Sequence, residues 1–155
     1  MIVRAARPAD VDRLLELMTG LARFEGYFDD FAVTRDSVLA GGFGDAPIFK
    51  AFVAEVEGTV IGMAVTYVVP WTYTLRPRLV LKELFINEGH RDAGAGRALF
   101  AAVAEHARHL GAGEIAWTVT NGNSKAEAFY RSVGGKPDVK WQNWTSGAGG
   151  YEDKC

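Results

Sequence analysis

The chain has 155 residues, the length of one ordinary domain, and we expect residues 1–155 to form a single domain. Its formal net charge is −2, so it lacks the basic excess that would hold the phosphates of a nucleic acid. No apolar run approaches the roughly 20 residues that a membrane helix needs, and the charged first residues argue against a signal peptide. We therefore expect a cytoplasmic protein with neither a nucleic-acid nor a membrane partner.

Cysteine and histidine usage narrows the possible chemistry. The single cysteine is Cys155, which excludes intrachain disulfides and argues against a cysteine nucleophile, because a chain end is seldom held rigidly. The three histidines, His90, His106 and His109, have no cysteine or suitably spaced partner. We expect no metal site, and we place His106 and His109 on a partly solvated helix face.

The first half of the chain predicts one strand, two helices and then a β region. Residues 2–5 form a short apolar stretch, and apolar residues at helical spacing from Val11 to Ala22 predict a helix ending at Gly26. Thr34 can cap a second, short helix, which we expect to stop at Gly41-Gly42.

Three strands are predicted next, at residues 49–56, 59–69 and 79–86. The break Glu57-Gly58 between the first two is typical of a hairpin. The third is apolar on both faces apart from two charged residues, which favours a central position in the sheet.

The second half predicts a long amphipathic helix from Ala95 to Leu110, a strand at 114–120 and a short helix that stops at Gly134-Gly135. Residues 136–144 could form a last strand, and no regular secondary structure is predicted for residues 145–155. The order β-α-α-β-β-β-α-β-α-β indicates a mixed α/β layer fold.

The turn from Arg91 to Gly96 connects the predicted strand at residues 79–86 to the start of the long helix. Helix N-termini present free N–H groups, glycine lets the backbone approach an anion closely, and Arg91 could add a charged contact. These residues fit a phosphate site, although a tight turn without a ligand explains two glycines equally well. Two other phosphate-binding templates fail, because Gly96 is followed by Arg97-Ala98 rather than Lys-Ser/Thr, and position 99 is leucine rather than glycine.

Two motifs carry a family resemblance. Arg91-x-x-Gly94-x-Gly96 resembles the pyrophosphate-binding loop of GNAT acetyltransferases, and Asn123-x-x-Ala126-x-x-Phe129-Tyr130 resembles their second signature. The chain is most similar to the spermidine/spermine (diamine) and thialysine N-acetyltransferases from residue 2 to about Trp141, through segments that include residues 2–6, 21–25, 42–47, 53–56, 61–62, 70–71 and 81–86.

The resemblance implies a GNAT fold, with a central mixed, mostly antiparallel sheet flanked by helices, and a homodimer. It also implies acetyl-CoA as the cofactor, held by Leu84, Phe85, Ile86, Arg91, Asp92, Ala93, Gly94, Ala95, Gly96, Arg97, Asn123, Ala126 and Tyr130. By the same resemblance, Tyr130 donates a proton to the leaving thiolate. The alternative is that Phe129 and Tyr130 are simply the apolar face of a short helix.

Lys82 and Glu83 interrupt an apolar strand, and charges there are costly unless they are paired or line a cavity. As neighbours on a strand they should point to opposite faces. The diamine enzymes carry two acids at this step, the first being the proposed base, and here the first position is Lys82. Glu83 could have taken over as base, water could relay the proton, or Glu83 could merely pair with a basic residue on a neighbouring strand.

The substrate expectation rests on charge. Val69 and Lys82 stand where the diamine enzymes have acids, and a like charge at about 4 Å costs roughly 4 kcal/mol at an effective dielectric near 20. We therefore expect a small-molecule primary amine that also carries an anion, such as an amino-acid-like or thialysine-like amine rather than a polyamine. The residues expected to bind it are Phe24, Glu25, Trp71 and Lys82.

Some of these roles have structural alternatives. Glu25 could instead be a solvated residue at a helix end, and Trp71 could cover the edge of the core. A non-catalytic acyl-CoA sensor on the same fold, or a protein or peptide acetyltransferase, is the alternative function. The sensor could dispense with Tyr130 and Glu83, and both are present.

Overall fold

The computed structural model describes residues 1–149, which fall into two compact units, Met1–Thr118 and the segment that begins at Val119. The expectations for Cys155 and for the last residues of the tail lie outside this range. Among the helices of the described residues, none is both long and apolar enough to cross a membrane.

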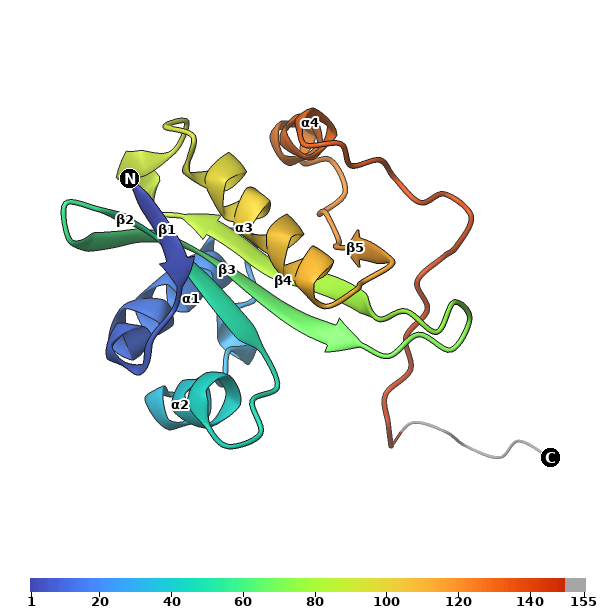
Figure 1. The fold of residues 1–155 in the computed structure, drawn as a ribbon, viewed down its shortest axis with the longest axis horizontal. Helices are drawn as coiled ribbons and strands as arrows, with labels where there is room; N and C mark the ends of the chain where they lie inside the picture. Colours follow the sequence, from blue (N-terminus) through green and yellow to red (C-terminus); the bar gives the residue numbers. More distant parts are fainter. Residues whose placement is uncertain (150–155) are drawn as a thin grey trace. The chain divides into compact units, whose positions relative to one another are not determined.

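The first unit is built on a five-stranded sheet in the order β1-β2-β3-β4-β5 (Figure 1). Its strands are β1 (Ile2–Ala5), β2 (Lys50–Val56), β3 (Thr59–Val69), β4 (Arg78–Ile86) and β5 (Glu114–Ala116). Neighbours pair antiparallel except β4 and β5, which are parallel. The mixed, mostly antiparallel sheet predicted from the sequence is confirmed.

Strand β5 is shorter than predicted, because it ends at Ala116 rather than at Thr120. It pairs only with Arg78–Val80, at the start of β4. Within the described residues, β4 from Leu81 to Ile86 therefore has a strand partner on the β3 side alone. The predicted central position of β4 holds only for its first residues, and its second half offers backbone groups on its other side.

Three helices cover the two faces of this sheet (Figure 1). Helices α1 (Val11–Glu25) and α2 (Arg35–Phe43) lie on one face, and α3 (Ala95–His109) lies on the other. Short 3₁₀ turns stand at Pro8–Asp10, Phe28–Asp30 and Glu88–His90. The core under α1 and α2 joins their apolar faces to side chains of β2 and β3: Val11, Leu14, Leu17, Met18, Leu21, Val38, Ala51, Val53, Val60, Met63 and Val65.

Most of the predicted element boundaries are observed. Gly26 ends α1 in the left-handed region, with φ of 81°, and the Thr34 side chain caps α2 by accepting from the Ser37 N–H. Glu57 and Gly58 both have positive φ, as a tight hairpin turn between β2 and β3 requires.

The predicted stop of α2 at Gly41-Gly42 is wrong, because the helix continues to Phe43. A Cβ atom at Gly41 or Gly42 would lie 2.8 or 2.7 Å from the ring of Phe49. These glycines therefore allow the Phe49 ring to pack against the helix rather than end it.

The second unit contains α4 (Ser124–Ser132). Asn123 caps this helix, since its side-chain oxygen accepts from the Ala126 N–H at 3.1 Å. The strand considered possible at 136–144 is absent, and residues 135–149 contain no helix or strand. Pro137 cannot donate to a ladder, and Val139, Trp141 and Trp144 are 90%, 71% and 86% exposed.

An ionic cluster fastens β1 to the start of α1. Arg4 donates to both oxygens of Asp10, at 2.8 and 3.0 Å, and to Glu55 of β2. Asp10 is only 9% exposed and also accepts from the Arg7 N–H. Its hydrogen bonds with Arg4 hold the pKa of this carboxyl below its usual range, although burial opposes them.

Asp10→Asn is expected to destabilise the fold by about 1–3 kcal/mol at pH 7, because it removes a hydrogen-bonded, largely buried charge. Asp12→Asn is the matched control, since Asp12 forms an ion pair with Arg35 but its side chain is 74% exposed. A carboxyl with a depressed pKa stabilises the fold above its unfolded pKa and loses that effect as the pH falls through its folded pKa. Urea unfolding should therefore show the Asp10→Asn deficit shrinking on acidification. A deficit equal to that of Asp12→Asn, or one independent of pH, would contradict this account.

Candidate active site

A β-bulge shapes the second half of β4. Val65 of β3 pairs with Glu83, but the next residue, Thr66, pairs with Leu81, so Lys82 is an extra residue without a cross-strand partner. The simple alternation expected for Lys82 and Glu83 is therefore broken. Glu83 lies opposite Val65, on the face under α1 and α2, and Lys82 is exposed.

Glu83 is a mostly buried carboxylate. Its Oε2 atom is inaccessible to solvent and has no hydrogen-bond partner among the described residues. Burial raises the pKa of Glu83, the positive charge of Lys82 lowers it by a smaller amount, and the negative charge of Glu25 raises it again. No ion pair of Glu83 with an Arg or Lys of a neighbouring strand forms within residues 1–149. An unsatisfied buried carboxylate with a raised pKa is typical of a functional group.

The end of α1 brings a second carboxylate and a phenol to the same place. A Cβ at Gly20 would lie 3.1 Å from the Phe85 ring, so this glycine lets α1 approach β4 closely. Tyr27, just after the helix, is half-buried, and burial raises its pKa, followed by the charges of Glu83 and Glu25. Glu25, Tyr27 and Glu83 therefore form one electrostatic cluster beside Lys82.

Tyr27 was missed by the sequence-based interpretation. Its neighbour Gly26 marks a helix end but gives no sign that this end packs beside β4. Only the tertiary approach of α1 to the sheet places the phenol near Glu83.

The turn before α3 has the geometry expected of an anion-binding loop. Gly94 is the residue before the helix, with φ of 82°, and provides no side-chain cap for the free N–H groups of the first turn. Asp92 also has positive φ, at 65°. A Cβ at Gly94 would meet no atom of residues 1–149 within 4 Å, so the approach to this backbone is open in the part of the chain that the structure describes.

Arg91 makes contacts that its sequence motif does not reveal. Its Nε donates to the Ile86 carbonyl at 3.2 Å, and its guanidinium lies 4.9 Å from the ring centroid of Phe24 and 5.6 Å from that of Phe85. Arg91 thus connects the turn before α3 to the end of α1.

Trp71 lies in the segment between β3 and β4 and contacts the start of β4, whereas Glu83 lies in the second half of that strand. Its ring stacks on Arg78, whose Cζ is 3.8 Å from the ring centroid. Arg78 in turn forms an ion pair with Glu114 of β5. This contact fits the alternative that Trp71 covers the edge of the sheet, and the structure does not bring Trp71 to the carboxylate cluster.

The other site residues predicted from the sequence lie on α4, in the second unit. Tyr130 is half-buried, with its ring 5.2 Å from that of Phe129 in an edge-on arrangement. Asn123 uses its side-chain oxygen to cap the helix at Ala126. The structure describes these residues within their own unit.

The fold and its comparisons define the class of protein. The model of the acetyltransferase (GNAT) family matches residues 13–134, and the chain therefore belongs to this family of acetyl-transferring enzymes. A solved aminoglycoside acetyltransferase from an uncultured soil metagenomic sample, in complex with sisomicin, superposes with a TM-score of 0.77 at 17% identity, over 94% of this chain and 96% of that one. A putative acetyltransferase from Agrobacterium tumefaciens gives a TM-score of 0.78 at 24% identity, over 94% and 100%.

The sequence is also similar to those of curated acetyltransferases, two of which are described here by their identity and coverage. The chain is 26% identical over 154 residues to thialysine N-epsilon-acetyltransferase of Sus scrofa, covering 94% of this chain and 90% of that protein. It is 34% identical over 160 aligned positions to streptothricin acetyltransferase of Streptomyces lavendulae, covering 84% and 79%. Acetylation of small amines is therefore supported at the level of the family.

Proposed function

We propose that this chain transfers an acetyl group from acetyl-CoA to the primary amine of a small molecule, with Glu83 as the group that accepts the amine's proton. The observation that carries the proposal is the buried Oε2 of Glu83, which has no hydrogen-bond partner among residues 1–149. A free alkylamine has a pKa of about 10.4 and must lose a proton before it can attack a carbonyl. A carboxylate whose pKa burial raises above its usual range is a suitable base for that step.

The residues of the α3 turn fit the diphosphate of coenzyme A. Gly94, Ala95, Gly96 and Arg97 offer main-chain N–H groups at a helix N-terminus, and no side chain of the described residues fills the space beside Gly94. The open side of β4 between Leu84 and Ile86 can pair with the amide groups of pantetheine. Bound acetyl-CoA supplies the thioester, and Tyr130 is proposed to protonate the departing thiolate. Asn123 and Ala126 are proposed to support the same cofactor from α4.

Lys82 suggests which amines are accepted. Because Lys82 is exposed, its repulsion of a second cation is nearer the 1 kcal/mol expected at about 4 Å in water than the roughly 4 kcal/mol expected in a less polar setting. This is a preference rather than an exclusion. Together with the similarity to a thialysine acetyltransferase, it favours a substrate whose amine faces Glu83 and Glu25 and whose carboxylate faces Lys82.

Lys82→Glu tests this assignment. We expect it to shift the ratio of kcat/KM for spermidine to that for thialysine by about fivefold or more toward spermidine, since it replaces a repulsion with an attraction of roughly 1 kcal/mol each. The ratio is measured by thiol release with both amines under matched ionic strength. Lys125→Glu, on α4, makes the same charge change as a control. An unchanged ratio in Lys82→Glu would remove Lys82 from the substrate site.

The experiment for the function as a whole combines binding and turnover. Calorimetry should show acetyl-CoA binding to the purified protein, and thiol release should depend on an added amine such as thialysine. Binding without amine-dependent release would contradict the transfer reaction, and absence of binding would contradict the cofactor assignment. We further propose a cytoplasmic homodimer with one domain per chain. The family match runs through the boundary between the two units, and exposed Trp141 and Trp144 suit an apolar contact.

A further inference from the structure

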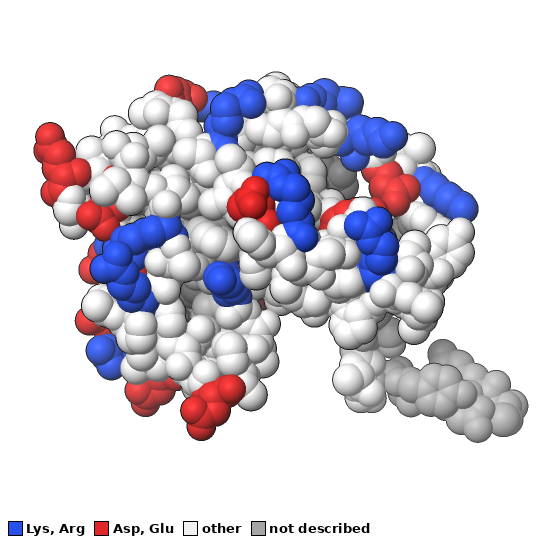
Figure 2. Space-filling view, viewed as in Figure 1, with Lys and Arg blue, Asp and Glu red and all other residues white. Residues whose placement is uncertain are grey.

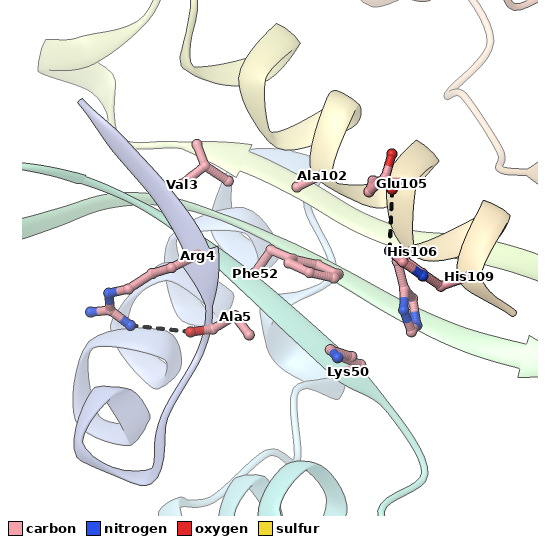
Figure 3. A pocket seen from close by; sticks show the side chains of 9 residues that line it. All are labelled: Val3, Arg4, Ala5, Lys50, Phe52, Ala102, Glu105, His106 and His109. Atoms are coloured by element: carbon pink, nitrogen blue, oxygen red, sulfur yellow. Dashed lines mark hydrogen bonds and ion pairs between the residues drawn. The ribbon is translucent and has the colours of Figure 1, made fainter.

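A hollow of about 290 Å³ lies on the α3 face of the sheet, at the β1–β2 edge (Figure 3). Its walls come from β1, β2 and the second half of α3: Val3, Arg4, Ala5, Lys50, Phe52, Ala102, Glu105, His106 and His109. None of these residues belongs to the proposed acetyl-transfer site. Its volume is at the lower end of small-molecule sites.

The floor of the hollow is apolar. Phe52 is 8% exposed, and its ring meets the His106 ring edge-on at 5.6 Å between centroids. Figure 3 shows Phe52 between the strand edge and α3, with Val3 and Ala102 above it. Such a surface suits the flat apolar part of a small molecule.

On the face drawn in Figure 2, acidic and basic side chains are scattered among uncharged ones. The rim of the hollow carries a positive charge, at Lys50, that the described residues do not neutralise. The Lys50 ammonium lies 5.6 Å from the Phe52 ring centroid, and no carboxylate pairs with it among the described residues. Burial lowers the pKa of His106, and the charges of Lys50 and His109 lower it further. The one acid in the hollow, Glu105, is already engaged by Arg108 and His109.

Arg4 does not contribute to this charge. Its guanidinium bonds to Asp10 and Glu55, and Figure 3 shows its side chain directed away from the hollow. The basic groups of the rim that no carboxylate of the described residues engages are therefore Lys50 and His106, both at the end where β2 begins.

We propose that this hollow binds a small organic carboxylate, with the carboxylate between Lys50 and His106 and the apolar body on Phe52. An anion there would compensate the charge of Lys50 and favour the protonated form of His106, and its apolar part would lie against the Val3, Phe52 and Ala102 side chains that line the hollow. The site is separate from the acetyl-transfer site and does not depend on it.

Benzoate is the probe, and the His106 imidazole signals in the NMR spectrum of the full chain are the readout. We expect benzoate to shift these signals saturably and to raise the pKa of His106, because a nearby negative charge favours imidazolium. Benzyl alcohol has the ring without the charge, and acetate has the charge without the ring. Both are expected to bind at least about tenfold more weakly.

Two lysine variants locate the binding. Lys50→Met should weaken benzoate about tenfold, the loss of one charge-assisted contact, while Lys82→Met should leave the His106 response unchanged. No saturable shift up to about 10 mM benzoate, which corresponds to less than roughly 3 kcal/mol of binding, would overturn the proposal. So would equal effects of the two variants, or equal binding of benzyl alcohol.

Discussion

Replacing Glu83 by glutamine is expected to lower kcat about 10²- to 10⁴-fold, the usual contribution of a positioned base, while leaving acetyl-CoA affinity within about twofold. The substitution keeps the shape of the side chain but removes its ability to accept a proton. Because the wild-type carboxylate is buried without a partner at Oε2, the amide is not expected to cost stability and could raise the melting temperature.

The pH dependence provides the more specific readout for Glu83. A base works only when deprotonated, and burial raises the pKa of Glu83, so wild-type kcat/KM should fall on acidification at a pH above the usual range of a carboxyl group. That acidic limb should be absent in Glu83→Gln. Glu57→Gln changes an exposed hairpin carboxylate and is the matched control. Retention of both rate and acidic limb in Glu83→Gln would make this residue a buried structural acid.

Gly94→Val is expected to weaken acetyl-CoA binding about tenfold or more, equivalent to at least roughly 1.4 kcal/mol in calorimetry. The residue stands at φ of 82°, where a β-branched side chain is strongly disfavoured, and its open surroundings are where a phosphate would approach the main chain. A valine there both strains the turn and occupies the approach to the free N–H groups of α3.

Gly58→Val separates strain from ligand contact. Gly58 lies in the β2–β3 hairpin with φ of 80°, and an added Cβ there likewise has no atom of the described residues within 4 Å. Both variants should lose stability, by at least about 1–2 kcal/mol each. Only Gly94→Val should lose affinity for acetyl-CoA. Equal losses of affinity in the two variants, or none in either, would place the diphosphate elsewhere.

Local signals in the sequence predicted much of the fold. The helical spacing from Val11 to Ala22, the cap at Thr34 and the hairpin at Glu57-Gly58 each depend on neighbours along the chain, and each is observed. The turn at Gly94 belongs to the same class, because glycine before a helix constrains the backbone locally.

The errors arise where distant segments decide the outcome. The bulge at Lys82 depends on the pairing of β4 with β3. The nearness of Tyr27 to Glu83 depends on the close packing of α1 on β4, where Gly20 contacts the Phe85 ring. The pair Gly41-Gly42 was interpreted as a stop, although its role is to make room for Phe49 from another segment. A last strand at residues 136–144 was a possibility, but this segment has no partner strand within the described chain.

The extra residue in β4 determines which layer of the protein receives the acid. Leu79 and Leu81 before it, and Leu84 and Ile86 after it, all face the layer of α3, while Glu83 and Phe85 face the layer of α1. In a regular strand over the same residues, positions 81 and 83 would share a face, and the carboxylate would lie in the opposite layer, beneath α3. Loss of Lys82 alone would make Leu81 and Glu83 successive residues of a regular strand, and the acid would keep its place under α1 while the adjacent positive charge disappeared.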